Sequence, residues 1–359
     1  MLSARPRRGA ASFNDAGRKQ YRGARRWIDR HVCAGCAHCG KPQDGGPGDT
    51  PIGAGKDGTK GPDGKAGCSG AATFPDAGVP TTTCDDNTTS NGGLGGAGQT
   101  GNGQTGGDGS ASPAVGMSNG GAGMPQVGGA CSDFTGGGKS GAPGKNGTPG
   151  MGASGTGTLS ASGYAGKPGD DGKSRGGPGQ GGGGGGGASS GACSNAKAGP
   201  AGAGGGSGGC GGLLGKGGGS AGSSIALVSL KAKVTLSDSK LVAADAGTGG
   251  KGSDGQPGGA GKIGGNGISA DNFKSCDGGA GGKGGQGGAG GAGLGGHSIA
   301  IAYTGDKTMN KPTYDSKNVT IALGKAGMGG KGGNGGTGNV GGDGMAGVAA
   351  EIQFFDSTM

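Results

Sequence analysis

Three stretches in the second half of the chain alternate apolar and polar residues, at positions 223–247, 297–327 and 347–355. Alternation with a period of two is typical of a β-strand with one face buried. We therefore predict strands at three alternating triplets: Ala232, Val234 and Leu236; Ile299, Ile301 and Tyr303; Val319, Ile321 and Leu323.

These stretches are internal repeats. SIAL at 224–227 matches SIAI at 298–301, and VAAEI at 348–352 is a degenerate third copy. TLSDSKLVAA at 235–244 similarly parallels TYDSKNVTIA at 313–322. Each SIA-type copy is entered from glycine. This repetition predicts stacked, solenoid-like coils in which neighbouring units cover each other's apolar face.

Between the strand repeats, glycine recurs at every third position in three runs of seven, over 249–267, 278–296 and 329–347. A period of three matches the polyproline II geometry, so each run predicts a rod with a reach of roughly 56 Å. The backbone groups of such a rod point sideways and need partners from neighbouring rods. The glycines expected at these contacts are Gly249, Gly252, Gly255, Gly258, Gly278, Gly281, Gly284, Gly287, Gly329, Gly332 and Gly335.

The order of these runs predicts a course for the chain. The rod at 249–267 runs out, a loop that holds Cys276 turns it, and the rod at 278–296 runs back into the next coil. The run at 329–347 is either one rod or a shorter hairpin broken at TGNVG, and the sequence does not decide between the two. Short collagen-like tracts at 55–67 and 137–150 are interpreted as further rods.

The glycine period and the cysteine-bearing loops over residues 45–347 resemble the polyglycine II proteins, a group that includes the snow-flea antifreeze protein and the glycine-rich tip adhesins of tailed phages. The GGAGG units are also similar to the PGRS-type repeats of mycobacterial surface proteins, without their leading PE domain. The resemblance is one of architecture. The predicted fold class is all-β or irregular, with bundles of polyglycine II helices inserted between short β-strand repeats and no substantial α-helix outside a candidate near residues 17–31.

Composition divides the chain into three predicted regions. Residues 1–44 are basic and Arg-rich with a cysteine triplet, residues 45–222 are glycine-rich with cysteine loops, and residues 223–359 alternate strand repeats with Gly-Gly-X rods. With 109 glycines in 359 residues and few aromatics, a disordered chain would be the default expectation. The constant register and length of the runs favour order instead.

The net charge of +9 is concentrated at the amino terminus. Eight arginines and Lys19 against Asp15 and Asp29 give +7 over the first 30 residues, which leaves +2 for the rest. A basic segment of this kind can bind nucleic acid or an anionic membrane, but no fold motif accompanies it, so we expect a solvated leader or targeting segment and no specific nucleic-acid partner. No stretch is long enough to span a membrane.

Nine cysteines are present, and the last six lie in or beside the loops that join rods. This placement predicts disulfides that fix rod ends and an extracellular or cell-surface location, with unpaired cytosolic thiols as the alternative. Local pairs such as Cys68 with Cys84 and Cys193 with Cys210 are the natural first guesses, although connectivity cannot be deduced from sequence. The disulfide candidates are Cys68, Cys84, Cys131, Cys193, Cys210 and Cys276.

The cysteine triplet is a weak metal-site candidate. Cys33, Cys36 and Cys39 with His38 place soft ligands at two-residue spacing, as zinc or an iron–sulfur cluster would require, but the fourth cysteine of a ferredoxin-like run is missing. Disulfides or an artefactual leader are the alternatives. His297 stands at a strand entry, and no catalytic constellation or cofactor-binding motif is found, so we expect neither an enzyme nor a cofactor.

Three functions fit these patterns. We favour an extracellular structural or adhesive protein, a disulfide-fixed scaffold of glycine rods that self-associates into oligomers or filaments and contacts a surface or matrix ligand. Ice binding is the first alternative, and charged rod positions such as Lys251, Asp254 and Lys283 speak against the neutral face it needs. A disordered matrix chain is the second alternative.

Overall fold

In the computed structural model, the residues described are 43–48, 54–75, 78–114, 120–126, 131, 135–193, 197–270 and 273–356. All of them belong to one compact unit, Gly40–Met359. The helix candidate near residues 17–31 lies outside the described residues. Within the described residues the fold is all-β or irregular, with short strands, no α-helix and no closed barrel.

The elements before residue 222 are short. They are β1 (Ala72–Thr73), β2 (Thr81–Thr83), β3 (Thr89–Asn91), β4 (Gly98–Gln99), β5 (Ser110–Ser112), β6 (Thr158–Ser160), β7 (Gly163–Ala165) and a 3-10 turn, η1 (Ser190–Ala192). All of their pairings are antiparallel: β1 with β4, β2 with β3, β3 with β5, and β6 with β7.

The elements after residue 222 are mostly paired in parallel. They are β8 (Ser224–Leu230), β9 (Thr235–Leu236), β10 (Ser239–Val242), β11 (Ser269–Ala270), β12 (Phe273–Lys274), β13 (Ser298–Thr304), β14 (Thr313–Tyr314), β15 (Val319–Ala322) and β16 (Ala349–Phe354). The antiparallel hairpin of β11 and β12 is the exception. This hairpin joins the glycine runs 249–267 and 278–296.

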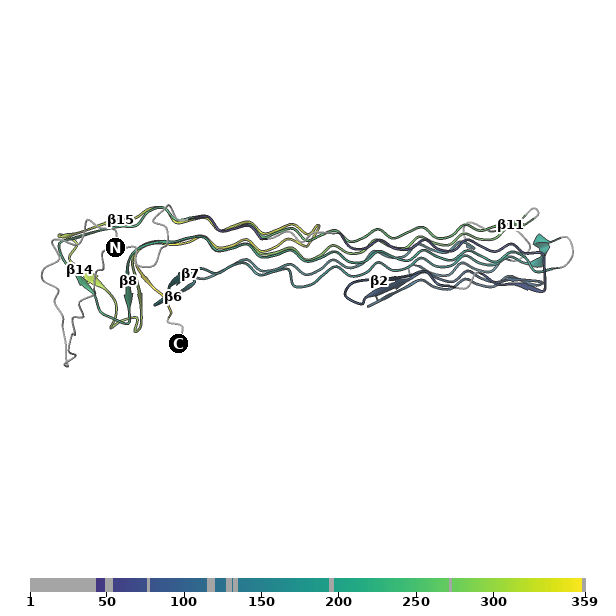
Figure 1. The fold of residues 1–359 in the computed structure, drawn as a ribbon, viewed down its shortest axis with the longest axis horizontal. Coiled ribbons are helices and arrows are strands. Elements are labelled where there is room, and N and C mark those ends of the chain that lie inside the picture. Colours follow the sequence, from purple (N-terminus) through teal and green to yellow (C-terminus); the bar gives the residue numbers. More distant parts are fainter. Residues whose placement is uncertain are drawn as a thin grey trace, which may run out of the picture. The chain divides into compact units, whose positions relative to one another are not determined.

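Extended glycine-rich segments make up most of the unit, and they run side by side between an end that carries β8, β14 and β15 and an end that carries β11 (Figure 1). Their backbone groups bond laterally, from one segment to the next, at every third residue. In the segment 278–296, the N–H groups of seven glycines donate to carbonyls of the preceding segment: Gly278 to Gly265, Gly281 to Lys262, Gly284 to Gly259, Gly287 to Gln256, Gly290 to Ser253, Gly293 to Gly250 and Gly296 to Gly247. The predicted outward and returning course is thus confirmed, because the partner number falls as the glycine number rises.

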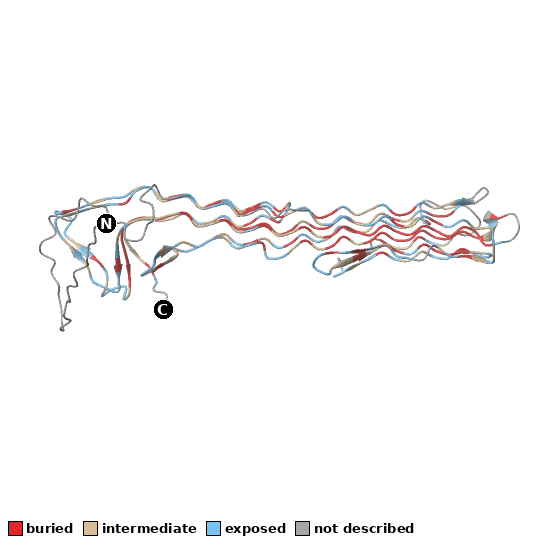
Figure 2. Ribbon diagram, in the orientation of Figure 1, coloured by how far each residue is buried: buried red, intermediate tan, exposed pale blue. Residues whose placement is uncertain are grey.

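The segment 278–296, here called the central segment, is surrounded by other segments. A second set of its N–H groups donates to carbonyl groups in the stretch 170–183. The N–H of Gly282, for example, donates to the carbonyl of Gln180. Backbone hydrogen bonds join it to six stretches: 141–153, 167–183, 206–221, 247–265, 327–333 and 342–345. Burial is accordingly concentrated in the inner segments (Figure 2), because only glycine lets so many backbones approach one another.

The glycine run at 329–347 is a hairpin rather than one rod. Gly336 and Gly338 have positive φ angles of 86° and 72°, which reverse the chain. The two arms then pair, with Gly344 N–H donating to Gly330 O and Gly341 N–H to Gly333 O. The break at TGNVG is thus the turn of this hairpin.

The strand repeats stack in register. Ser298 pairs with Ser224 in β8, and it also pairs with Ala349 in β16, so β13 lies between its two copies. The equivalent short strands β9 and β14 pair, as do β10 and β15. The chain therefore makes two similar turns, 224–242 and 298–322, and adds the single strand β16 on top.

Three details of the strand repeats differ from the predictions. The predicted strand through Ala232 and Val234 is only Thr235–Leu236, because residues 231–234 form the link between two sheets. The repeat alignment shifts by two residues within the second turn, since Thr235 pairs with Thr313 but Ser239 pairs with Val319. Finally, β13 is buried along its whole length, because β8 and β16 flank it and other residues cover its face.

Candidate functional site

The predicted packing glycines lie at backbone contacts. At each of them a Cβ atom would lie within 3.0 Å of a backbone carbonyl oxygen of another segment or hairpin arm; the positions are Gly249, Gly252, Gly255, Gly258, Gly278, Gly281, Gly284, Gly287, Gly329, Gly332 and Gly335. In proteins, a Cβ atom essentially never lies this close to a backbone atom of another segment. These glycines are therefore required by the packing of the segments.

The six candidate cysteines form three disulfides, but the local pairings suggested by the sequence are wrong. Cys68 pairs with Cys193, Cys84 with Cys210, and Cys131 with Cys276, at sequence separations of 125, 126 and 145 residues. Nearness in the chain does not decide the partner, because segments distant in sequence lie side by side. Closing loops of this length stabilises the fold by about 4 to 5 kcal/mol each in the chain-entropy account.

The Cys84–Cys210 disulfide holds a hairpin against a glycine segment rather than fixing a segment's end. Cys84 lies in the turn between β2 and β3, and Cys210 is buried in the interior of the segment 199–219. A buried hydrogen bond between the Thr82 and Ser207 hydroxyls, 2.6 Å long, adds a second connection. The hairpin is thereby attached along one side of the bundle.

Surface aspartates connect neighbouring segments, a role that the sequence did not reveal. Asp171 accepts a hydrogen bond of 2.8 Å from the backbone N–H of Gly217 and pairs with Lys216 Nζ at 2.7 Å. The same double contact to a lysine and to a backbone N–H recurs at Asp57, Asp63, Asp254, Asp277 and Asp343. Each aspartate satisfies an N–H group at the edge of the bundle where no glycine segment follows.

At Asp171 and Asp343 these contacts lower the pKa of the carboxyl group. The hydrogen bond from Lys216 is the largest cause that lowers the pKa of Asp171, and the bond from the Gly217 N–H lowers it further. Lys331 and the Gly332 N–H lower the pKa of Asp343 in the same order. The charged carboxylate is the form that both donors favour.

At the strand-bearing end, His297 is a buried structural residue with 0% of its surface exposed. Val348 N–H donates to Nδ1 over 2.7 Å, so Nε2 carries the proton and donates to the Thr156 carbonyl over 2.9 Å. Burial lowers the pKa of His297, and the bond to Thr156 partly opposes that effect. The rings of Tyr164 and Phe355 meet its imidazole edge to face.

Phe355, which contacts the His297 ring, also belongs to a small apolar core at this end. Leu159 of β6 packs with Ile299 of β13 and with Phe355, which follows β16 and is fully buried. The position of the β6–β7 hairpin over the strand repeats could not be predicted, because glycine segments separate the hairpin from these repeats along the chain. This hairpin is one reason that β13 is buried on both faces.

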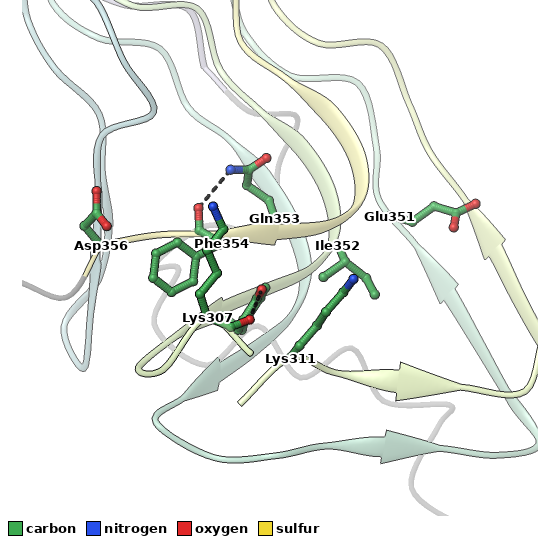
Figure 3. Close-up of a pocket in the computed structure, with 8 residues that line it drawn as sticks. Lys307, Lys311, Glu351, Ile352, Gln353, Phe354 and Asp356 are labelled. Carbon is green, nitrogen blue, oxygen red and sulfur yellow. Dashed lines mark hydrogen bonds between the residues drawn. The ribbon is translucent and has the colours of Figure 1, made fainter. Parts of the chain in front are cut away.

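A pocket also lies at this end. It has a volume of about 820 Å³ and is lined by the link between β13 and β14 and by β16. Figure 3 shows Lys307 beside the ring of Phe354 and Lys311 beside Ile352. The Lys307 ammonium lies 5.8 Å from the centre of the Phe354 ring, within the range of a cation–π interaction.

The link that carries these lysines is well ordered by its own hydrogen bonds. Asp306 Oδ1 accepts from the N–H groups of Thr308 and Met309, at 2.9 and 2.7 Å. Asn310 Oδ1 accepts from Asp306 N–H over 2.7 Å, and the buried Tyr303 hydroxyl donates to the Lys307 carbonyl over 3.0 Å. The link is therefore a fixed platform for the two lysines.

One acidic residue of the pocket, Glu351, faces outwards. Glu351 points away from Lys307 and Lys311 in Figure 3, and its carboxylate accepts a hydrogen bond from the Tyr314 hydroxyl, which raises the pKa of Tyr314. Asp356 lies at the other side of the pocket. Within the described chain, neither Lys307 nor Lys311 takes part in an ion pair.

The predicted metal ligands Cys33, Cys36, Cys39 and His38 lie outside the described residues. In the part of the chain that is described, no group of three or more His, Cys, Asp or Glu residues is arranged to hold a metal ion. That part also contains no helix long and apolar enough to cross a membrane.

Comparison with protein families finds no matching family model, and comparisons with curated proteins and with solved structures find no match either.

Proposed function

We propose that this chain is an extracellular, non-enzymatic structural or adhesive protein in which packed polyglycine II rods form a stiff, disulfide-fixed scaffold. The observation that carries the proposal is the central segment, whose backbone is bonded to six surrounding stretches. A glycine-rich chain bound in this way presents regular length and stiffness, and side chains project only from its outer faces.

The polyglycine II assignment is supported by the lateral bonding at every third residue. Three residues per turn, with backbone groups pointing sideways, is the geometry that this spacing requires. The parallel stacking of β8, β13 and β16 likewise supports a β-solenoid-like set of coils at one end, with the rods as long insertions between coils.

An extracellular location is supported by the three disulfides, which persist in oxidising compartments. The paired lysines and aspartates of the outer segments, such as Lys331 with Asp343 and Lys262 with Asp57, give the rods charged faces. These charged faces favour a hydrated scaffold over an ice-binding protein, which would need a neutral face.

Self-association is supported by the edges of the parallel sheet. β8 and β16 are its outer strands, and an unpaired strand edge is a template for another chain. We propose that copies of this chain join through these edges into oligomers or filaments. Light scattering coupled to size-exclusion chromatography tests this, and a monomeric mass that persists at high protein concentration contradicts it.

The scaffold is tested by small-angle X-ray scattering on the oxidised protein and on a reduced, alkylated sample. An unfolded chain of this length has a radius of gyration of about 68 Å and a compact one about 21 Å. We expect the oxidised protein to lie far below the unfolded value. A coil-like value for the oxidised protein would instead indicate a disordered matrix chain.

The adhesive role is tested by attaching the labelled protein to cells and to beads coated with matrix polysaccharides. We expect saturable attachment that an excess of unlabelled protein displaces. A matched variant with Gly284→Val and Gly287→Val, which disrupts rod packing, separates the contribution of the scaffold from that of the surface. Attachment that never saturates on any surface would contradict an adhesive role.

A further inference from the structure

The pocket at the strand-bearing end is created by an insertion in the second turn of the strand repeats. Between the paired positions Leu230–Thr304 and Thr235–Thr313, the first turn has four residues, 231–234, and the second has eight, 305–312. The longer link supplies Lys307 and Lys311 to the pocket. An ordered insertion on a rigid scaffold is a usual place for a binding site.

The third strand repeat supplies the other side of the pocket. Ile352, Gln353 and Phe354 of β16 line it opposite the longer link. The pocket's volume of about 820 Å³ falls within the range of small-ligand sites.

The charges of the lining favour an anionic group. The lysines of the glycine segments that contact aspartates, such as Lys216 with Asp171 and Lys331 with Asp343, are neutralised locally. Lys307 and Lys311 have no such ion-pair partner within the described chain, and Glu351 is engaged by Tyr314 on the far side. Two ammonium groups, that of Lys307 beside the Phe354 ring and that of Lys311 beside Ile352, thus remain for a ligand.

We propose that this pocket binds an acidic carbohydrate unit, with Lys307 and Lys311 contacting its carboxylate and Phe354 contacting its ring. The carboxylate of Asp356 at the rim accepts a hydrogen bond from a sugar hydroxyl. A mostly polar ligand fits a lining in which lysines, carboxylates and amides surround one aromatic face. This inference rests on the proposed adhesive function and names the chemistry of its ligand.

The experiment titrates the oxidised full-length protein with trigalacturonic acid and with the neutral trisaccharide maltotriose, by isothermal titration calorimetry at fixed ionic strength. We expect binding of the acidic trisaccharide and none of the neutral one. Lys311→Ala and Lys307→Ala should each weaken binding at least tenfold. Lys139→Ala, which removes an exposed lysine from a glycine segment, is the matched control and should leave the affinity unchanged.

Absence of trigalacturonic acid binding would overturn the pocket assignment. Equal weakening by Lys139→Ala and Lys311→Ala would also overturn it, because that result indicates diffuse charge attraction. The cell and bead attachment assay, run on the same preparations, separates the two proposals. Attachment without sugar binding removes the pocket proposal alone, whereas sugar binding without attachment removes the adhesive function alone.

Discussion

Gly284 of the central segment lies directly against the carbonyl oxygen of Cys210, so close that a Cβ atom on Gly284 would overlap it. Gly284 also donates its N–H to Gly259, so the residue is fixed between two neighbouring segments. The contact is between backbones, and no side-chain rotation can relieve an added methyl group.

Gly284→Val is expected to lower the free energy of unfolding by about 3 kcal/mol, at the upper end of the usual cost of overpacking, because the segments must separate to admit the side chain. Guanidinium denaturation measures the effect. Lys283→Ala, one residue away on the exposed side, should change stability by less than about 0.5 kcal/mol. Equal sensitivity of the two variants to proteolysis would contradict the packing of backbones against one another.

Cys84→Ser combined with Cys210→Ser should lower stability by about 2 to 5 kcal/mol. We expect a local effect as well, with faster amide hydrogen exchange in β2 and β3, which this disulfide attaches to the segment 199–219. The paired replacement of Cys131 and Cys276 is the control and should leave exchange in β2 and β3 slow. If amide exchange in β2 and β3 were equally fast in the two variants, the Cys84–Cys210 disulfide would not be what holds this hairpin.

His297 should make the strand-bearing end sensitive to acid. Its pKa is lowered in the folded protein, so below about pH 6.5 the unfolded chain binds a proton that the folded chain resists, and stability falls as the pH decreases. Above that pH both states are neutral and the residue adds no pH dependence. The free energy of unfolding at pH 8 and pH 5 should differ more for the wild type than for His297→Gln, whose amide cannot be protonated in this range.

Asp171 should contribute stability that is lost only in strong acid. Its pKa is lowered in the folded protein, so the contribution is present above the unfolded value near 3.8 and disappears as the pH falls through the lower folded value. Asp171→Asn keeps an acceptor for the Gly217 N–H, whereas Asp171→Ala removes it. We expect the alanine variant to be less stable than the asparagine variant at pH 7, by about 1 kcal/mol or less because the site is half-exposed. Equal stability of the two would show that the N–H contact is unimportant.

The features that depend on spacing within the chain were predictable. A period of three in the run 278–296 implied backbone groups that bond sideways, and the repeated SIA sequences implied that Ser224 and Ser298 are equivalent. Both follow from local geometry and from the need of each unit to be covered by its neighbour.

The features that depend on which segments become neighbours were not predictable. Cys68 pairs with Cys193 rather than Cys84 because the lateral order of the segments decides the distance between cysteines. Asp171 reaches Gly217 for the same reason. The pocket depends on the different lengths of two links, and the aligned sequences alone do not show that Lys307 and Phe354 meet.

The hydrogen bonds between the backbones of the glycine segments have a mechanical consequence, because they run across the segments. A force applied along the segments therefore loads all the hydrogen bonds of one segment together, in shear. In peeling, by contrast, the hydrogen bonds open one after another. Resistance to such a force therefore grows with the length over which two segments overlap. The central segment, bonded to neighbours at every third residue from Gly278 to Gly296, is the one that such a force would displace last.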